Sequence, residues 1–118
     1  MKSIRLEKIN SLLREEIGSI IQRDLKDPRI GFVSILEVRT SPDLHEAKVF
    51  VSVFADDENK RKTIKGLRSA AGFIHHEIKE RLSLRHIPNI IFELDDSIEK
   101  GAHILELMEK ISKDEKIE

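Results

Sequence analysis

The chain has 118 residues, no cysteine, 36% charged residues and a formal net charge of −1. This length suits one domain with a real core, and the lack of cysteine excludes disulfides, thiolate metal sites and cysteine nucleophiles. No stretch reaches the ~18 apolar residues of a membrane span, and the charged start of the chain does not resemble a signal peptide. We therefore expect a cytoplasmic protein with one domain over residues 1–111 and a short charged tail over 112–118.

The first half of the chain predicts a helix followed by two strands. Apolar residues recur at helical spacing over about residues 3–25, and Asp27-Pro28 ends this helix because the residue before a proline avoids the α region. The β-branched stretch 32–40 and the alternating stretch 47–54 predict strands, and the short turn at 41–44 indicates an antiparallel pair. The apolar stripe of the helix comprises Ile9, Leu12, Leu13, Ile17, Ile20, Ile21 and Leu25.

The second half predicts two helices, a strand and a last helix. A helix over about 57–69 is followed by the small residues Ala70, Ala71 and Gly72 and by another helix that ends near Leu82. A strand follows at 90–94, a turn at 95–97, and a last helix at about 98–111. The order α-β-β-α-α-β-α predicts an α+β domain with its helices on one face of a small sheet.

The near-neutral net charge hides a strong asymmetry along the chain. Residues 59–92 carry eight Lys and Arg against two acids, whereas residues 93–118 carry nine acids against four Lys. A basic middle and an acidic end are typical of a protein that meets a polyanion on one face only. Gly72, between the two helices, would let a nucleic-acid backbone approach the protein backbone closely.

The element order also matches a KH domain of the second type, in which a GxxG loop between two helices clamps the nucleic-acid backbone. The GxxG sequence is absent here, and the junction reads Ser-Ala-Ala-Gly. The expected fold class is therefore α+β and KH-like (type II), with a different connection between the two helices.

Several short motifs carry a family resemblance from Ile4 to about Met108. Each is weak alone, but their order and spacing together resemble the bacterial ribosome-binding factor A family. In that family an Ala-x-Gly kink replaces the KH loop, and Ala70-Ala71-Gly72 fits it. The other motifs are Lys26-Asp27-Pro28-Arg29-Ile30, Ser41-Pro42-Asp43-Leu44 followed by Ala47-Lys48-Val49-Phe50-Val51-Ser52, Gly72-Phe73-Ile74, Leu82-Ser83-Leu84-Arg85 with Pro88, and Phe92-Glu93-Leu94-Asp95 followed by Ser97.

The resemblance implies a non-enzymatic assembly factor without a cofactor. Members of this family bind the free 30S ribosomal subunit, not the full ribosome, and assist late maturation of 16S ribosomal RNA, including processing at its 5′ end. The resemblance also implies a role in growth in the cold, action as a monomer, and release by a GTPase once the subunit is mature.

Cationic side chains around the kink and near the start of the chain supply the candidate RNA contacts. Such residues give salt-dependent affinity by releasing counterions from phosphates, although a solvated helix face with ordinary i,i+4 ion pairs is the alternative. Arg29 is equally well explained as the partner of a nearby acid, and the kink as a close contact that needs small side chains. The candidates are Arg5, Lys8, Arg29, Lys65, Arg68, His75, His76, Lys79, Arg81 and Arg85.

The sequence shows neither a catalytic motif nor a set of residues spaced to bind a metal ion. His75 and His76 are adjacent, so they point about 100° apart on a helix and do not share an ion, and no Ser/His/Asp or glycine-rich phosphate motif is visible. Two other functions fit the same pattern. One is a generic KH module that binds short single-stranded RNA without the subunit, and the other is a protein-interaction domain whose binding survives nuclease treatment.

Overall fold

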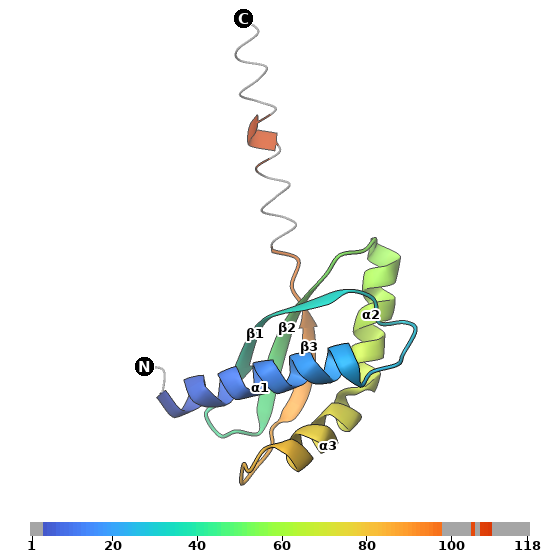
Figure 1. The fold of residues 1–118 in the computed structure, drawn as a ribbon. Helices are drawn as coiled ribbons and strands as arrows, with labels where there is room; N and C mark the ends of the chain where they lie inside the picture. The colour runs from blue at the N-terminus through green and yellow to red at the C-terminus, as the bar shows by residue number, and fades with distance from the viewer. Residues whose placement is uncertain (1–3, 98–104, 106, 110–118) are drawn as a thin grey trace, which may run out of the picture.

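The computed structural model describes residues 4–97, 105 and 107–109. Of the predicted last helix, residues 105 and 107–109 are helical, and the others lie outside the described residues. No helix in the described ranges is long and apolar enough to cross a membrane. The elements follow the predicted order: α1 (Ile4–Arg23), β1 (Val33–Thr40), β2 (Glu46–Val53), α2 (Asp57–Ser69), α3 (Ala71–Arg81) and β3 (Asn89–Leu94) (Figure 1).

The strands make one mixed sheet in the order β1-β2-β3. β1 and β2 pair antiparallel, with Val33 opposite Val53, which confirms the pairing that the short turn predicts. β2 and β3 pair in parallel, with Glu46 opposite Asn89. This parallel pairing needs a long crossover, and α2 and α3 supply it.

The helices pack against one face of the sheet, with α1 crossing in front of the strands (Figure 1). Alternate residues of β2 point into this layer, so Ala47, Val49 and Val51 are fully buried while Lys48 between them is exposed. Phe92 of β3 is also fully buried, and truncating such a side chain to Ala costs about 3–5 kcal/mol of stability. The α+β prediction is therefore confirmed by the layering as well as by the element order.

α1 buries one stripe of its surface against this sheet, and the stripe is narrower than predicted. The Leu12 side chain is 42% exposed, so its assignment to the buried stripe is wrong. Leu12 and Leu13 are adjacent, and the 100° step between neighbouring helical residues turns Leu12 away when Leu13 faces the core. The buried residues of α1 are Ile9, Leu13, Ile17 and Ile20.

α2 and α3 meet at Ala70, whose backbone remains in the right-handed α region (φ −86°, ψ −4°). α2 begins after Asp56, whose Oδ1 accepts a hydrogen bond from the N–H of Asn59 at 2.8 Å, a standard N-cap. The helix then passes the loop that follows α1 at very short range. A Cβ on Gly66 would lie 2.8 Å from Cγ1 of Ile30, so this contact requires a glycine.

Candidate nucleic-acid interface

One end of the domain brings together four segments that are distant in sequence: the first turns of α1, the last turns of α3, the loop 82–88 and the turn before β2 (Figure 1). After α3, Leu82 adopts extended backbone (φ −111°, ψ 138°), which takes the chain out of the helix. The N–H of Asn89 donates to the carbonyl oxygen of His45 at 2.9 Å. This bond holds the turn before β2 beside the start of β3, so the four segments share one surface.

Two adjoining grooves of about 490 and 500 Å³ occupy this end of the molecule. The first lies beside the start of α1 and the second beside α3, and both are lined by Leu84, Arg85 and His86. Five of the ten predicted RNA contacts line one groove or the other. We name the cationic and imidazole side chains of both grooves the basic end, and they are Arg5, Lys8, His45, His75, Lys79, Arg85 and His86.

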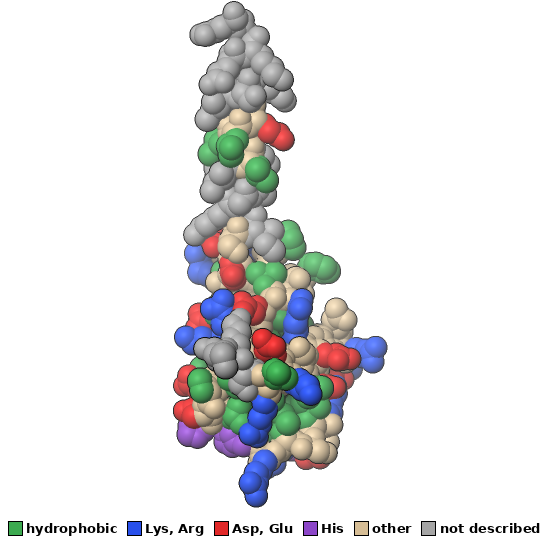
Figure 2. Space-filling view, turned by 90° about the vertical axis from the view of Figure 1, so that its left-hand side faces the viewer, with side chains coloured by type: hydrophobic (Ala, Val, Ile, Leu, Met, Phe, Trp, Pro, Cys, Tyr) green, Lys and Arg blue, Asp and Glu red, His purple; other side chains and the backbone are tan. Residues whose placement is uncertain are grey.

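His45 and His86 belong to the basic end although neither is among the predicted RNA contacts. Their rings meet edge to face with centroids 5.5 Å apart, and Figure 2 shows histidine side chains together at the lower left of the domain. The only signal in the sequence is that His86 directly follows Arg85 in the basic stretch. The position of His45 depends on the parallel pairing of β2 with β3, which a single sequence does not specify.

His75 is the half-buried member of the basic end. Its Nε2 lies 3.1 Å from the carbonyl oxygen of Ile87, a bond that requires a proton on Nε2. His76 is exposed and lines neither groove, because it points away from its neighbour around the helix. In the described part of the chain, no group of three or more His, Asp or Glu could hold a metal ion.

Arg29 lies outside the basic end and is paired with an acid. Its Nε donates to Oδ1 of Asp27 at 3.0 Å and its Nη2 to Oδ2 at 2.6 Å. This side-chain hydrogen bonding lowers the pKa of Asp27 and raises the pKa of Arg29. The Arg29 carbonyl oxygen also accepts a bond from Oγ1 of Thr63 at 3.1 Å, so Arg29 joins the loop after α1 to α2.

Arg81 is likewise engaged with carboxylates. Its guanidinium reaches Asp24 at 2.5 Å, Glu77 at 3.3 Å and Glu16 at 3.8 Å. The hydrogen bond that Arg81 donates to Asp24 is the main reason why the pKa of Arg81 is raised. Arg81 therefore connects α3 to α1, and its charge is already balanced by neighbouring acids.

Arg68 and Lys65 project from α2, away from both grooves. Nε and Nη2 of Arg68 each donate to the carbonyl oxygen of Phe92 at 3.3 Å, which covers the outer edge of β3. Lys65 is exposed on the same helix. The predicted contacts thus separate into five at the basic end, three in structural bonds (Arg29, Arg68 and Arg81) and two on exposed helix faces elsewhere (Lys65 and His76).

The kink between α2 and α3 is open to solvent at its glycine. Ala70 and Ala71 pack against the core, but a Cβ added to Gly72 would meet nothing within 4 Å. Close packing therefore accounts for the small residues Ala70 and Ala71 but not for Gly72, and the glycine that close packing requires is Gly66. The space above Gly72 is available to an external ligand.

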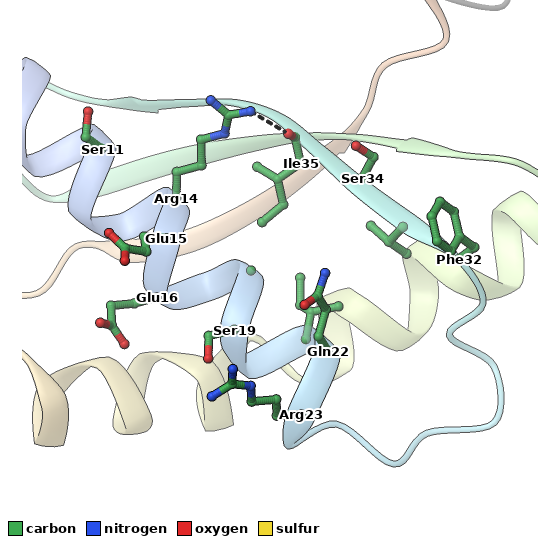
Figure 3. Close-up of a pocket in the computed structure, with 13 residues that line it drawn as sticks. Ser11, Arg14, Glu15, Glu16, Ser19, Gln22, Arg23, Phe32, Ser34 and Ile35 are labelled. Carbon is green, nitrogen blue, oxygen red and sulfur yellow. Dashed lines mark hydrogen bonds between the residues drawn. The ribbon is translucent and has the colours of Figure 1, made fainter.

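A third groove, of about 790 Å³, lies between α1 and the first half of β1 (Figure 3). Nη2 of Arg14 donates to the carbonyl oxygen of Ile35 at 3.3 Å across it. The groove is bordered by Arg14 and Arg23 but also by Glu15 and Glu16. Its two arginines are matched by two glutamates, whereas the two grooves of the basic end together are lined by four Lys and Arg against Glu46 alone. The basic end is therefore the better surface for nucleic acid.

Comparison with known proteins agrees with the resemblance noted in the sequence. The family model described as ribosome-binding factor A matches residues 5–108. Ribosome-binding factor A of Halothermothrix orenii is 46% identical over 115 residues, which cover 98% of this chain and 94% of that protein. The family resemblance is thereby confirmed.

Solved structures show the same fold. The crystal structure of ribosome-binding factor A from Thermus thermophilus matches with a TM-score of 0.66 and 24% identity, covering 75% of this chain and 94% of that one. A homology model of the Thermus thermophilus protein, as fitted into a cryo-EM map of a complex between the 30S subunit and ribosome-binding factor A, matches with a TM-score of 0.58 and 24% identity, covering 81% of this chain and 97% of that one. These matches confirm the KH-like fold, and with the sequence match over residues 5–108 they establish that the chain belongs to the ribosome-binding factor A family.

Proposed function

We propose that this protein binds the free 30S ribosomal subunit and assists late maturation of 16S ribosomal RNA, including processing of its 5′ end, without catalysing a reaction. Family membership over residues 5–108 is the observation that carries the proposal. The coordinates of the Thermus thermophilus relative, fitted into a map of a complex with the 30S subunit, support the choice of partner.

The basic end supplies a physical means of binding. Within the described residues no ion pair engages Lys8, Lys79 or Arg85, so their charges are available to phosphates. Arg85 can bind a phosphate through two N–H groups, whereas the lysines act as point charges. Gly72, near the start of α3, leaves room for a backbone to approach the other end of this helix. Such contacts recognise the charge and shape of an RNA backbone and depend little on its base sequence.

Sedimentation with ribosomal particles tests the proposal. Purified protein is centrifuged through sucrose gradients with 30S, 50S and 70S particles at low and at moderate salt. We expect comigration with 30S alone and weaker binding as salt rises, because bound cations release counterions from the RNA. Comigration with no particle would overturn the proposal. Tight binding of short oligonucleotides would then favour a generic RNA-binding module, and binding that survives nuclease would favour a protein partner.

The finer expectations of the family belong to the same proposal. The protein acts as a monomer, leaves the mature subunit through the action of a GTPase, and matters most for growth in the cold. A strain without the protein should accumulate 16S precursor with an unprocessed 5′ end, more strongly in the cold than at the ordinary growth temperature. Normal precursor levels under both conditions would exclude the processing role while leaving 30S binding to the sedimentation test.

A further inference from the structure

The groove beside α3 contains three histidines from three separate segments. His45 comes from the turn before β2, His75 from α3 and His86 from the loop after α3. The three histidines line one groove of about 500 Å³. A volume of this size falls within the range of small-ligand sites, and the grouping is more than packing requires, since His45 has a side chain that is 71% exposed.

The permanent charges around this groove cancel. Lys79 and Arg85 line it with two positive charges. Glu46 lines it from the start of β2, and Oδ2 of Asp43 lies 3.4 Å from Nδ1 of His45. Hydrogen bonds from Ser41 and from the His45 N–H lower the pKa of Asp43, so this carboxylate stays ionised at neutral pH.

Protonation of the histidines therefore decides whether the groove carries a net positive charge. With neutral imidazoles the two cations and two carboxylates sum to zero, and with three imidazolium groups the groove carries a charge of +3. Of the other groups that face it, Asn89 at the start of β3 is neutral. Arg5 and Lys8 of α1 border the adjoining groove and add positive charge on that side at every pH near neutral.

We propose that His45, His75 and His86, together with Lys79 and Arg85, form a binding site for a phosphate group whose affinity rises as the imidazoles take up protons. The inference rests on the proposed function in naming the phosphate as one of an RNA backbone. A bound oxyanion accepts hydrogen bonds from imidazolium N–H groups and from the permanent cations. The His75 imidazole has a fixed orientation in the groove, because its Nε2 is bonded to the carbonyl oxygen of Ile87.

The close approach of the His45 and His86 rings explains why the groove favours an anionic ligand when both rings are protonated. Their ring centroids are 5.5 Å apart, so two protonated rings repel each other when nothing lies between or above them. A phosphate in the groove offsets that repulsion, and binding favours the protonated rings in return. Imidazole ordinarily titrates near pH 6.5, so affinity should rise as pH falls through this range and decline above it.

The first test measures 30S binding at about pH 6 and about pH 8, the range over which histidine changes charge. We expect the wild-type protein to bind about fivefold more tightly at the lower pH, since each exposed charge contact contributes a modest amount. The double variant His45→Ala/His86→Ala should lose most of this pH response. Both side chains are exposed, so the variant should fold normally, as a thermal melt will check.

His76→Ala is the matched control, because it removes an imidazole from α3 that lines neither groove. It should keep the wild-type pH response. An equal response in the wild-type protein, the double variant and the control would overturn the phosphate site while leaving 30S binding intact. Failure of the wild-type protein to bind 30S at either pH would overturn the proposed function, and the second test then decides on the site by itself.

The second test follows the imidazole resonances by NMR while a short uridine oligoribonucleotide is added, since uridine has no group that titrates in this range. Resonances of His45 and His86 should shift more at about pH 6 than at about pH 8, and those of His76 should not. Inorganic phosphate added at one fixed pH separates the two sources of phosphate. Shifts with inorganic phosphate alone would overturn the RNA backbone as the ligand, and no shift with either probe would overturn the site.

Discussion

Gly66 and Gly72 lie six positions apart on consecutive helices, and their surroundings give them different roles. Gly66 faces the loop after α1, where a Cβ would lie 2.8 Å from Ile30 Cγ1 and 3.4 Å from Arg29 Cβ. Gly72 faces open space. A glycine costs about 1 kcal/mol relative to Ala within a helix. At Gly66 close packing offsets that cost, whereas at Gly72 no close contact offsets it.

Substitution of each glycine by Ala should therefore change stability in opposite directions. Gly66→Ala forces Ile30 or the loop backbone to move and should lower the free energy of unfolding by about 1–3 kcal/mol. Gly72→Ala should raise it by up to about 1 kcal/mol through helix propensity. Urea unfolding of both variants and of the wild-type protein measures the two effects. A Gly66→Ala variant as stable as wild type would show that the loop adapts without strain.

The ion pair between Asp27 and Arg29 makes stability depend on pH. Because the pair lowers the pKa of Asp27 in the folded protein, the carboxylate stabilises the fold at pH values above its unfolded pKa of about 3.9. That contribution disappears as pH falls through the lower folded value. Asp27→Asn should thus reduce stability near neutral pH and have little effect in acid.

Urea unfolding at about pH 7 and about pH 2.5, on either side of the ordinary carboxyl pKa, tests this expectation. Glu15→Gln serves as the control, because it removes an exposed carboxylate on α1. A deficit in Asp27→Asn that is equal at the two pH values would mean that the substitution acts through packing, not through the charge.

At the scale of elements, arginines protect both edges of the sheet. Arg14 of α1 donates to the Ile35 carbonyl of β1, and Arg68 of α2 donates to the Phe92 carbonyl of β3. Exposed strand edges invite pairing with other chains, and charged side chains laid across them discourage it. This role explains why Arg68 belongs to the basic stretch of the sequence without facing the basic end.

The junction of α2 and α3 should affect binding without affecting folding. Gly72→Val adds a branched side chain into open space, so the free energy of unfolding should change by less than about 0.5 kcal/mol. If RNA approaches the backbone there, the 30S affinity should fall, and it should fall less for Gly72→Ala. Sedimentation with 30S measures the graded series. Wild-type affinity in both variants would show that the kink is not part of the interface.

At the scale of the whole molecule, the fold separates charges that the sequence places close together. Arg81 and Arg85 are four positions apart, yet Arg81 is bound by three carboxylates and Arg85 lines both grooves. Arg5 and Lys8 lie near the start of the sequence and still join Arg85, because the first turns of α1 lie beside the loop 82–88. The proposed polyanion-binding surface is therefore composed of residues from both halves of the chain.

Neutralising the basic end should reduce the salt dependence of 30S binding. In Lys79→Gln/Arg85→Gln, the slope of log affinity against log salt should decrease in magnitude by about 2, since each lost phosphate contact removes about 1. Lys65→Gln, on the exposed face of α2, is the control and should leave the slope near the wild-type value. Equal slopes in all three proteins would place the RNA contacts elsewhere on the surface.

The sequence by itself determined the elements, the fold class and the family. Helical and alternating apolar periods depend on local geometry, so the bounds of α1, β1, β2, α2, α3 and β3 agree with the predictions to within a few residues. Motif order is also a property of the linear chain, and it identified the family from pieces such as Lys26-Asp27-Pro28-Arg29-Ile30. The charge asymmetry indicated the class of partner, again because it can be counted along the chain.

Only the tertiary structure decided which cations are available to a ligand. Arg29 and Arg81 are both candidate RNA contacts in the sequence, but contacts with Asp27 and Asp24 occupy them. His45 enters the site because β2 pairs in parallel with β3, and Gly66 is a packing glycine because α2 meets the loop after α1. Each of these facts depends on a contact between distant segments, and such contacts are set by the packing of the whole core, not by the local sequence.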